Sequence, residues 1–243
     1  MLRNKAKRIH DSIYLKGKPV IKESFKFLLK EINKNQKNFK TLIDIGCSNG
    51  AFLSLVKSKY PKTQLTGLDI RKDLIKLAKR TCPSAKFINM DINNKKSYKR
   101  INEKFEVCVL DGVHSIFDDQ KIWLNNLIKF CDRHGKIYIF GSFNPNPYDV
   151  IVRVKKSGTK LLETGFNRLS LMTMIRELKR RNFLTKIKKF NFNLNLKKNN
   201  SDPRRTHTIR LKNDKYLTIN GLEQISTKFL VIAWSKKWKK NYM

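Results

Sequence analysis

Short apolar runs alternate with helix-like stretches along most of the chain. The first two runs, residues 41–45 and 64–69, have the apolar and β-branched composition of buried strands. Residues 50–59, which separate them, follow a helical pattern. Three further strand patterns follow, at 85–91, 105–111 and 135–140. This order predicts one α/β domain, because a helix between successive strands is typical of that class.

The C-terminal part of the chain continues the pattern and then interrupts it. Residues 169–181 carry an apolar stripe with helical spacing, and residues 183–187 and 229–234 are predicted as two more strands. A long interval, 191–227, separates these two strands. It contains two runs of alternating apolar and polar residues around the turn signal Asn213-Asp214. We expect a β-hairpin insertion there.

The turn after the first strand carries the most chemical information. In residues 44–50 (Asp-Ile-Gly-Cys-Ser-Asn-Gly), small side chains let the backbone bend sharply and approach a ligand. The turn lacks the Gly-Lys-Ser/Thr ending of a phosphate loop, and its glycine spacing differs from the dinucleotide pattern Gly-x-Gly-x-x-Gly. It does match the hydrolase pattern Gly-x-Ser-x-Gly. That elbow follows several strands, however, whereas only about forty basic, helix-like residues precede this one.

These residues resemble the first motif of class I methyltransferases that use S-adenosylmethionine, which is acidic-x-Gly-x-Gly-x-Gly. The motif here is Asp44-x-Gly46-x-Ser48-x-Gly50, with the small Ser48 in place of the middle glycine. A second acid, Asp69, ends the next predicted strand. A carboxylate at that point can accept hydrogen bonds from both ribose hydroxyls of an adenosyl cofactor.

The resemblance implies a Rossmann-like three-layer sandwich with a seven-stranded, mostly parallel sheet. Its last two strands, 183–187 and 229–234, would form an antiparallel hairpin at one sheet edge. It also implies S-adenosyl-L-methionine as the cofactor, bound outside the carboxyl ends of the strands. The residues expected to bind it are Asp44, Gly46, Cys47, Ser48, Gly50, Asp69, Ile70, Asp91, Ile92 and Asp111.

Two of these acids have specific alternatives. Asp91 would either contact the exocyclic amine of the adenine or act as the N-cap of a helix over 93–102. Asp111 ends the strand that should face the transferred methyl group. We expect it to contact the cofactor or the backbone rather than to act as a base.

His114 is the candidate catalytic residue. Methyl transfer is a displacement at a sulfonium methyl, so the enzyme aligns the acceptor and, for a hydroxyl acceptor, removes a proton. Histidine can take that proton near neutral pH. The alternative is a structural His114 that packs against the cofactor or caps a helix beginning near Asp118.

Other segments are expected to extend the pocket. Residues 144–148 (Asn-Pro-Asn-Pro-Tyr) resemble the Asn-Pro-Pro-Tyr loop of methyltransferases that modify exocyclic amines, but they follow the fifth strand instead of the fourth and contain an extra asparagine. We expect a proline-rich turn there, with Phe143 and Tyr148 as pocket walls. In the insertion, Arg205 and His207 are candidates for acceptor recognition, and a solvated hairpin without that role fits equally well.

Residues 1–38 form a basic extension before the methyltransferase domain, which we place at 39–243. The apolar residues of the extension predict one or two helices beside the cofactor cleft, and His10 and Tyr14 are candidate pocket residues. The chain has neither an apolar run of membrane-spanning length nor a secretory signal, so a soluble cytoplasmic protein is expected. Neither a metal site nor a disulfide framework is predicted, because the cysteines are isolated from one another in the sequence.

The formal net charge of the chain is +35, from 54 Lys and Arg against 19 Asp and Glu. Such a charge favours a polyanionic partner such as RNA. The basic residues are nevertheless spread along the chain, and abundant asparagine with scarce alanine indicates an A/T-rich coding bias that also raises the lysine content. Coding bias does not account for the scarcity of acids.

Two weaker resemblances concern the acceptor. Residues 141–145, and later 205–208 with 220–222, are similar to methyltransferases of sugar and surface-polysaccharide pathways. They imply a small-molecule or sugar-containing acceptor that is methylated on a hydroxyl. Two alternatives stay open, an RNA methyltransferase and a catalytically inactive protein that binds nucleic acid or another anionic surface.

Overall fold

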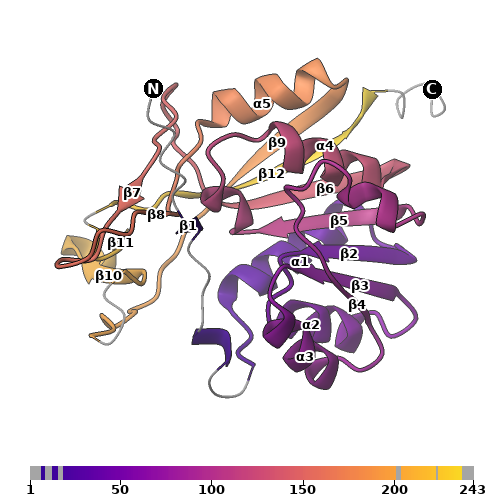
Figure 1. Cartoon of the computed structure of the whole chain (residues 1–243), viewed down its shortest axis with the longest axis horizontal. Coiled ribbons are helices and arrows are strands. Elements are labelled where there is room, and N and C mark those ends of the chain that lie inside the picture. Colours follow the sequence, from indigo (N-terminus) through magenta and orange to yellow (C-terminus); the bar gives the residue numbers. More distant parts are fainter. Residues whose placement is uncertain (1–6, 9–12, 16–18, 201–203, 223, 237–243) are drawn as a thin grey trace.

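The computed structural model describes residues 7–8, 13–15, 19–200, 204–222 and 224–236, so His10 lies outside the described residues. Its centre is a seven-stranded sheet in the order β4-β3-β2-β5-β6-β12-β9 (Figure 1). The strands are β2 (Thr41–Ile45), β3 (Gln64–Asp69), β4 (Lys86–Asn89), β5 (Phe105–Asp111), β6 (Cys131–Ser142), β9 (Phe183–Phe190) and β12 (Lys228–Ser235). Strands β2 to β6 are parallel to one another, and β12 runs antiparallel to both β6 and β9. The predicted sheet and its antiparallel last pair are confirmed.

Helices cover both faces of the sheet. Successive strand residues point to opposite sides, so a continuously apolar strand presents apolar side chains to both layers of helices. On one side, Leu42 packs in a cluster with apolar residues of α1 (Glu23–Asn35), α2 (Ala51–Lys59) and α3 (Lys72–Thr81). On the other side, Ile43 packs with residues of α4 (Lys121–Phe130) and α5 (Leu171–Arg180). The result is the three-layer sandwich that the sequence predicts.

Two small sheets lie beyond one end of the main sheet, on the left in Figure 1. One is the antiparallel hairpin of β10 (His207–Arg210) and β11 (Tyr216–Ile219), which agrees with the predicted insertion. The other joins β1 (Lys7–Arg8), β8 (Glu163–Thr164) and β7 (Arg153–Val154), a pairing that the sequence analysis did not anticipate. Within the described part of the chain, every helix is too short or too polar to span a membrane.

The predicted helix over 93–102 is wrong. Only a short 3-10 helix, η2 (Ser97–Arg100), forms in this region. The side-chain amide of Asn126, which is buried on α4, donates to the carbonyls of Ile92 and Asn94 at 2.7 and 2.8 Å. These carbonyls are therefore bonded to another element, and the chain turns where a helix would have begun.

Candidate functional site

A cavity of about 660 Å³ opens at the carboxyl ends of the parallel strands. Its floor is the series of turns that follow β2, β3, β4 and β5, together with the end of β6. Residues from the N-terminal segment, from 166–168, and from 205–206 and 224–228 form the remaining walls. Nine of the ten predicted cofactor residues line this pocket, namely Asp44, Gly46, Cys47, Ser48, Asp69, Ile70, Asp91, Ile92 and Asp111.

The turn after β2 depends on left-handed backbone conformations. Gly46, Ser48 and Gly50 have φ angles of 76°, 51° and 78°. A Cβ atom added to Gly46 would lie 2.2 Å from Cγ2 of Val113, so only glycine fits there. Gly50, the tenth predicted residue, does not line the pocket; it precedes α2, and an added Cβ would lie 3.2 Å from the backbone of Ala78.

Asp69 fixes the shape of this turn. One carboxylate oxygen accepts a hydrogen bond from the Ser48 amide, and the other accepts one from the Arg71 amide, each at 2.9 Å. Each oxygen of a carboxylate can accept more than one hydrogen bond. The buried Asp69 can therefore hold the turn and still bind hydroxyl groups in the pocket.

Asp91 is held from two sides at the end of β4. Its carboxylate accepts a hydrogen bond from the Asn93 amide at 2.8 Å and forms an ion pair with Arg8, also at 2.8 Å. The guanidinium of Arg8 also lies 4.9 Å from the centre of the Phe117 ring. Asp91 thus caps a turn rather than a helix, and Arg8 of β1 lines the pocket beside it.

The position of His114 does not support its predicted role as a catalytic base. The side chain is fully buried and is not among the residues that line the pocket. Its ring stacks on Phe143, with 4.3 Å between the ring centres, and its Nε2 lies 3.0 Å from the carbonyl oxygen of Ser142. Because a carbonyl only accepts, Nε2 carries the proton and donates it. His114 therefore supports the end of β6 from below the pocket.

The buried His114 gives a testable pH dependence of stability. Burial lowers the pKa of His114 from 6.5 to about 4. Between these two values the unfolded chain binds a proton that the folded chain does not. The contribution of the neutral His114 to the free energy of unfolding is therefore fully present above pH 6.5 and is lost as the pH falls toward 4. We expect the free energy of unfolding of the wild type, relative to His114→Gln, to fall by about 3 kcal/mol from pH 7 to pH 4. Urea denaturation at several pH values measures this difference, and a pH-independent difference would contradict the buried, neutral histidine.

Three predicted pocket residues lie elsewhere. Phe143 is in the core under His114, and the side chain of Tyr148 is 71% exposed on the outer surface. His207 lies on β10, where its Nδ1 is 3.4 Å from the carbonyl oxygen of Arg205, and it does not line the pocket. Tyr14 and Arg205 do line it, as expected.

Several lining residues escaped the sequence analysis because no motif marks them. Lys22 precedes α1, Lys228 begins β12, and Phe166 and Arg168 precede α5. Phe166 has a φ angle of 60°, which is uncommon for a bulky residue. The adjacent Asn167 holds this conformation, since its buried amide group bonds to Phe117 and Val152 at 3.0 and 2.7 Å. The fold, rather than local sequence, places these side chains.

Comparison with known proteins identifies the family. Residues 36–164, more than half of the chain, match a family described as a methyltransferase domain. The chain therefore belongs to this methyltransferase family, whose cofactor is S-adenosylmethionine. The class of protein predicted from the turn after β2 is confirmed.

Individual relatives cover part of the chain. The putative methyltransferase 235L of Invertebrate iridescent virus 6 is 37% identical over 130 residues, which are 53% of this chain and 48% of the viral protein. Malonyl-acyl-carrier-protein O-methyltransferase 2 of Ilyobacter polytropus is 25% identical over 130 residues, or 54% of this chain and 49% of that protein. The chain thus spans about half the length of these relatives.

Solved structures share the fold. The plantazolicin methyltransferase BpumL, in complex with a pentazolic desmethylPZN analog and SAH, has a TM-score of 0.55 and 16% identity over 88% of this chain and 87% of its own. The YcgJ protein from Bacillus subtilis has a TM-score of 0.57 and 10% identity over 86% of this chain and 97% of its own. At these identities the likeness concerns the fold alone.

The residues of the pocket fit a cofactor that carries positive charge. Burial raises the pKa of Asp44 well above its usual range, and the nearby Asp111 and Asp69 raise it further, against the opposing effect of Lys22. The sulfonium and ammonium groups of S-adenosylmethionine would relieve this concentration of negative charge. The Oγ atom of Ser48 is buried without a hydrogen-bond partner among the described residues, and it would offer the cofactor a further polar contact.

Proposed function

We propose that the protein transfers a methyl group from S-adenosylmethionine to an oxygen of a small-molecule or sugar-containing acceptor. One observation carries this proposal: a single pocket joins the turn after β2 to a polar wall built from segments outside the parallel strands. Its volume of about 660 Å³ lies in the range typical of small-molecule sites. Cofactor and acceptor can therefore meet inside the protein.

The residues at the strand ends have distinct proposed tasks in binding the cofactor. The bound cofactor supplies the methyl group. Asp69 accepts hydrogen bonds from its ribose, and Asp44 and Ser48 contact its amino-acid part. Arg8 and Asp91 enclose the side where the adenine is expected, because their ion pair ties the N-terminal segment to the end of β4. Enclosure excludes water and fixes the orientation of both reactants.

Asp111 replaces His114 as the residue to which we assign proton removal from a hydroxyl acceptor. It lines the pocket at the end of β5. Burial raises the pKa of Asp111, whereas Lys22 and Lys228 lower it. A carboxylate with a raised pKa is a stronger proton acceptor than an ordinary aspartate.

The names of the relatives agree with a small acceptor. The two proteins of Ilyobacter polytropus are named for O-methylation of malonyl-acyl-carrier protein, and two Acidovorax proteins for methylation of trans-aconitate. Trans-aconitate is a small acid, whereas the malonyl group is carried on a protein. These relatives match this chain over about half of its length or less.

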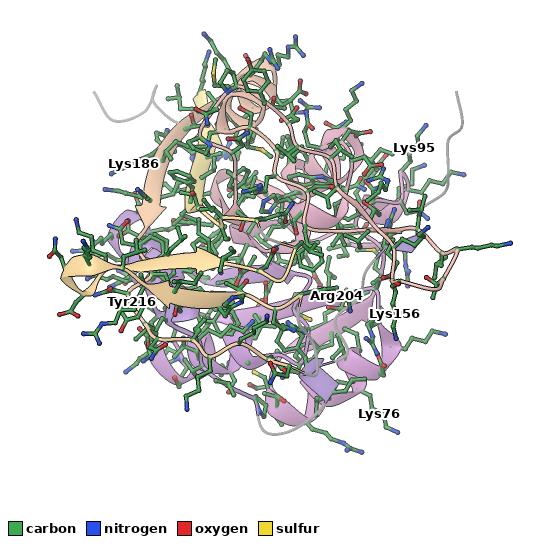
Figure 2. All side chains as sticks on the ribbon, turned by 90° about the vertical axis from the view of Figure 1, so that its left-hand side faces the viewer. Lys76, Lys95, Lys156, Lys186, Arg204 and Tyr216 are labelled. Carbon is green, nitrogen blue, oxygen red and sulfur yellow. The ribbon has the colours of Figure 1, made fainter. Side chains whose placement is uncertain are left out.

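RNA remains a second candidate acceptor because of the net charge of +35. Figure 2 shows lysines on both sides of the molecule, with Lys186 on the left and Lys95, Lys156 and Lys76 along the right. A charge distributed in this way attracts polyanions generally but does not outline one binding track. The distribution of charge therefore favours the pocket over the surface as the site of acceptor binding.

An assay with labelled cofactor tests the proposed function. The full chain is incubated with methyl-labelled S-adenosylmethionine and, in separate reactions, with sugar nucleotides, small organic acids and total RNA. We expect label in one of the small-molecule pools and none in RNA. The Asp69→Ala variant is the control, because any label that it still transfers does not depend on the cofactor site. Label in RNA alone would overturn the small-molecule acceptor, and no label in any pool, together with absent cofactor binding, would favour a catalytically inactive binding protein.

A further inference from the structure

Positive charge also lines the pocket, close to the acids at the ends of β2 and β5. We call Lys22, Arg168, Arg205 and Lys228 the cationic wall; all four line the pocket. They come from four segments that are far apart in the sequence, before α1, α5 and β10 and at the start of β12. The fold therefore gathers four basic side chains in one enclosed place.

Contacts connect the members of the cationic wall. The guanidinium of Arg205 lies 5.6 Å from the centre of the Tyr14 ring, and the Tyr14 hydroxyl accepts a hydrogen bond from Lys22 at 2.8 Å. Lys22 and Lys228 both act electrostatically on Asp111. Arg168 donates to the carbonyl of Ile225, in the segment that leads to Lys228. Tyr14, Asp111 and residues 225–228 thus link the four cations in a chain along the pocket lining.

Arg168 and Lys228 are incompletely compensated within this wall. The Nε–H group of Arg168 is buried and has no hydrogen-bond partner among the described residues. Burial lowers the pKa of Lys228, although Asp111 opposes this effect. A buried donor without an acceptor and a partly buried cation both cost free energy unless a ligand compensates them. A bound anion would satisfy both groups.

We propose that the acceptor carries a carboxylate or phosphate group, and that Arg168 and Lys228 bind this group while the neighbouring oxygen is methylated. The proposal rests on the proposed function, since it concerns the acceptor of the same reaction. Arginine suits this task because its planar guanidinium matches the geometry of carboxylate and phosphate oxygens. Lys22 and Arg205 would add to the attraction from the same wall.

Titration of the protein with small anions tests the proposal. The full chain is saturated with S-adenosylhomocysteine and titrated by calorimetry with inorganic phosphate and, separately, with malonate. We expect saturable binding of one anion per chain, and the tighter of the two anions distinguishes a phosphate from a carboxylate acceptor. The variant Arg168→Met/Lys228→Met should weaken this binding by about tenfold or more.

A matched control separates the pocket from the general surface charge. Lys76 and Lys156 are exposed, project outward in Figure 2 and do not line the pocket. The variant Lys76→Met/Lys156→Met loses the same two charges, and its affinity for the anion should change less than twofold. Affinity for S-adenosylhomocysteine, measured for both variants, shows that each one is folded with an intact cofactor site.

The outcomes distinguish this inference from the proposed function. Binding of S-adenosylhomocysteine without saturable binding of phosphate or malonate overturns the anionic acceptor but leaves the methyltransferase. Equal losses of anion affinity in the pocket variant and the surface variant overturn the anionic acceptor as well, because surface charge would then explain the binding. Binding of a short oligoribonucleotide that the pocket variant abolishes, with no binding of the free anions, assigns the cationic wall to RNA. Failure to bind S-adenosylhomocysteine overturns the proposed function, and the inference falls with it.

Discussion

Asp69→Ala is expected to weaken the binding of S-adenosylmethionine about a hundredfold or more. The change removes the carboxylate proposed to accept both ribose hydroxyls, and hydrogen bonds to a charged group contribute roughly 1.5–3 kcal/mol each. It also removes the acceptor of the Ser48 and Arg71 amides, which lie 2.9 Å from its two oxygens. The turn after β2 would therefore lose its shape as well as its ligand contact.

Calorimetric titration with S-adenosylmethionine measures the effect, and two further variants sharpen it. Asp69→Asn keeps one acceptor oxygen, so its loss of affinity should lie between that of the wild type and that of Asp69→Ala. Glu103→Ala is the matched control, because Glu103 is an exposed acid that pairs with Lys86 and does not line the pocket. Its affinity should equal that of the wild type. Undiminished binding by Asp69→Ala would remove Asp69 from the cofactor site.

The sequence predicted which residues of the strand ends line the pocket, because this information is local. In β2 and the turn that follows, an apolar strand runs directly into small residues, and Asp69 follows β3 in the same way. Strands that are parallel neighbours place such turns side by side. Once the order β4-β3-β2-β5 is granted, the nine predicted residues approach one cavity.

The sequence did not predict the basic residues that line the pocket, because their position depends on how distant segments pack. Lys22, Arg168 and Lys228 belong to no common pattern, and only the packing of the N-terminal segment, the 163–170 segment and β12 brings them together. The ion pair between Arg8 and Asp91 is of the same kind, since it joins residues 83 positions apart. Long-range contacts of charged side chains leave no periodic trace in a single sequence.

His114 shows how one local pattern permits two different placements. A histidine shortly after a buried strand can face the pocket or turn beneath it. Here Gly141 decides the outcome, because a Cβ atom at that position would lie 2.3 Å from Cε1 of the imidazole. The missing side chain of Gly141 opens the space in which the ring stacks on Phe143. Gly141 and His114 are separated along the chain, so this fit is visible only in three dimensions.

Gly46→Ala is expected to destabilise the protein by about 3 kcal/mol and to abolish cofactor binding. Two costs combine. The left-handed φ angle of 76° costs a residue with a Cβ roughly 1–2 kcal/mol. The new methyl group would also lie 2.2 Å from Cγ2 of Val113, and overpacking of this kind costs roughly 1–3 kcal/mol.

Two comparisons separate these costs by urea denaturation. Gly158 has nearly the same φ angle, 77°, but no atom lies within 4 Å of an added Cβ, so Gly158→Ala should show the conformational cost of about 1 kcal/mol alone. In the double variant Gly46→Ala/Val113→Ala the overlap is relieved. Its destabilisation should therefore be smaller than the sum of the two single changes by roughly 1–3 kcal/mol. If Gly46→Ala costs no more than Gly158→Ala, the turn after β2 does not pack against Val113, and the contact that joins the ends of β2 and β5 beneath the cofactor is absent.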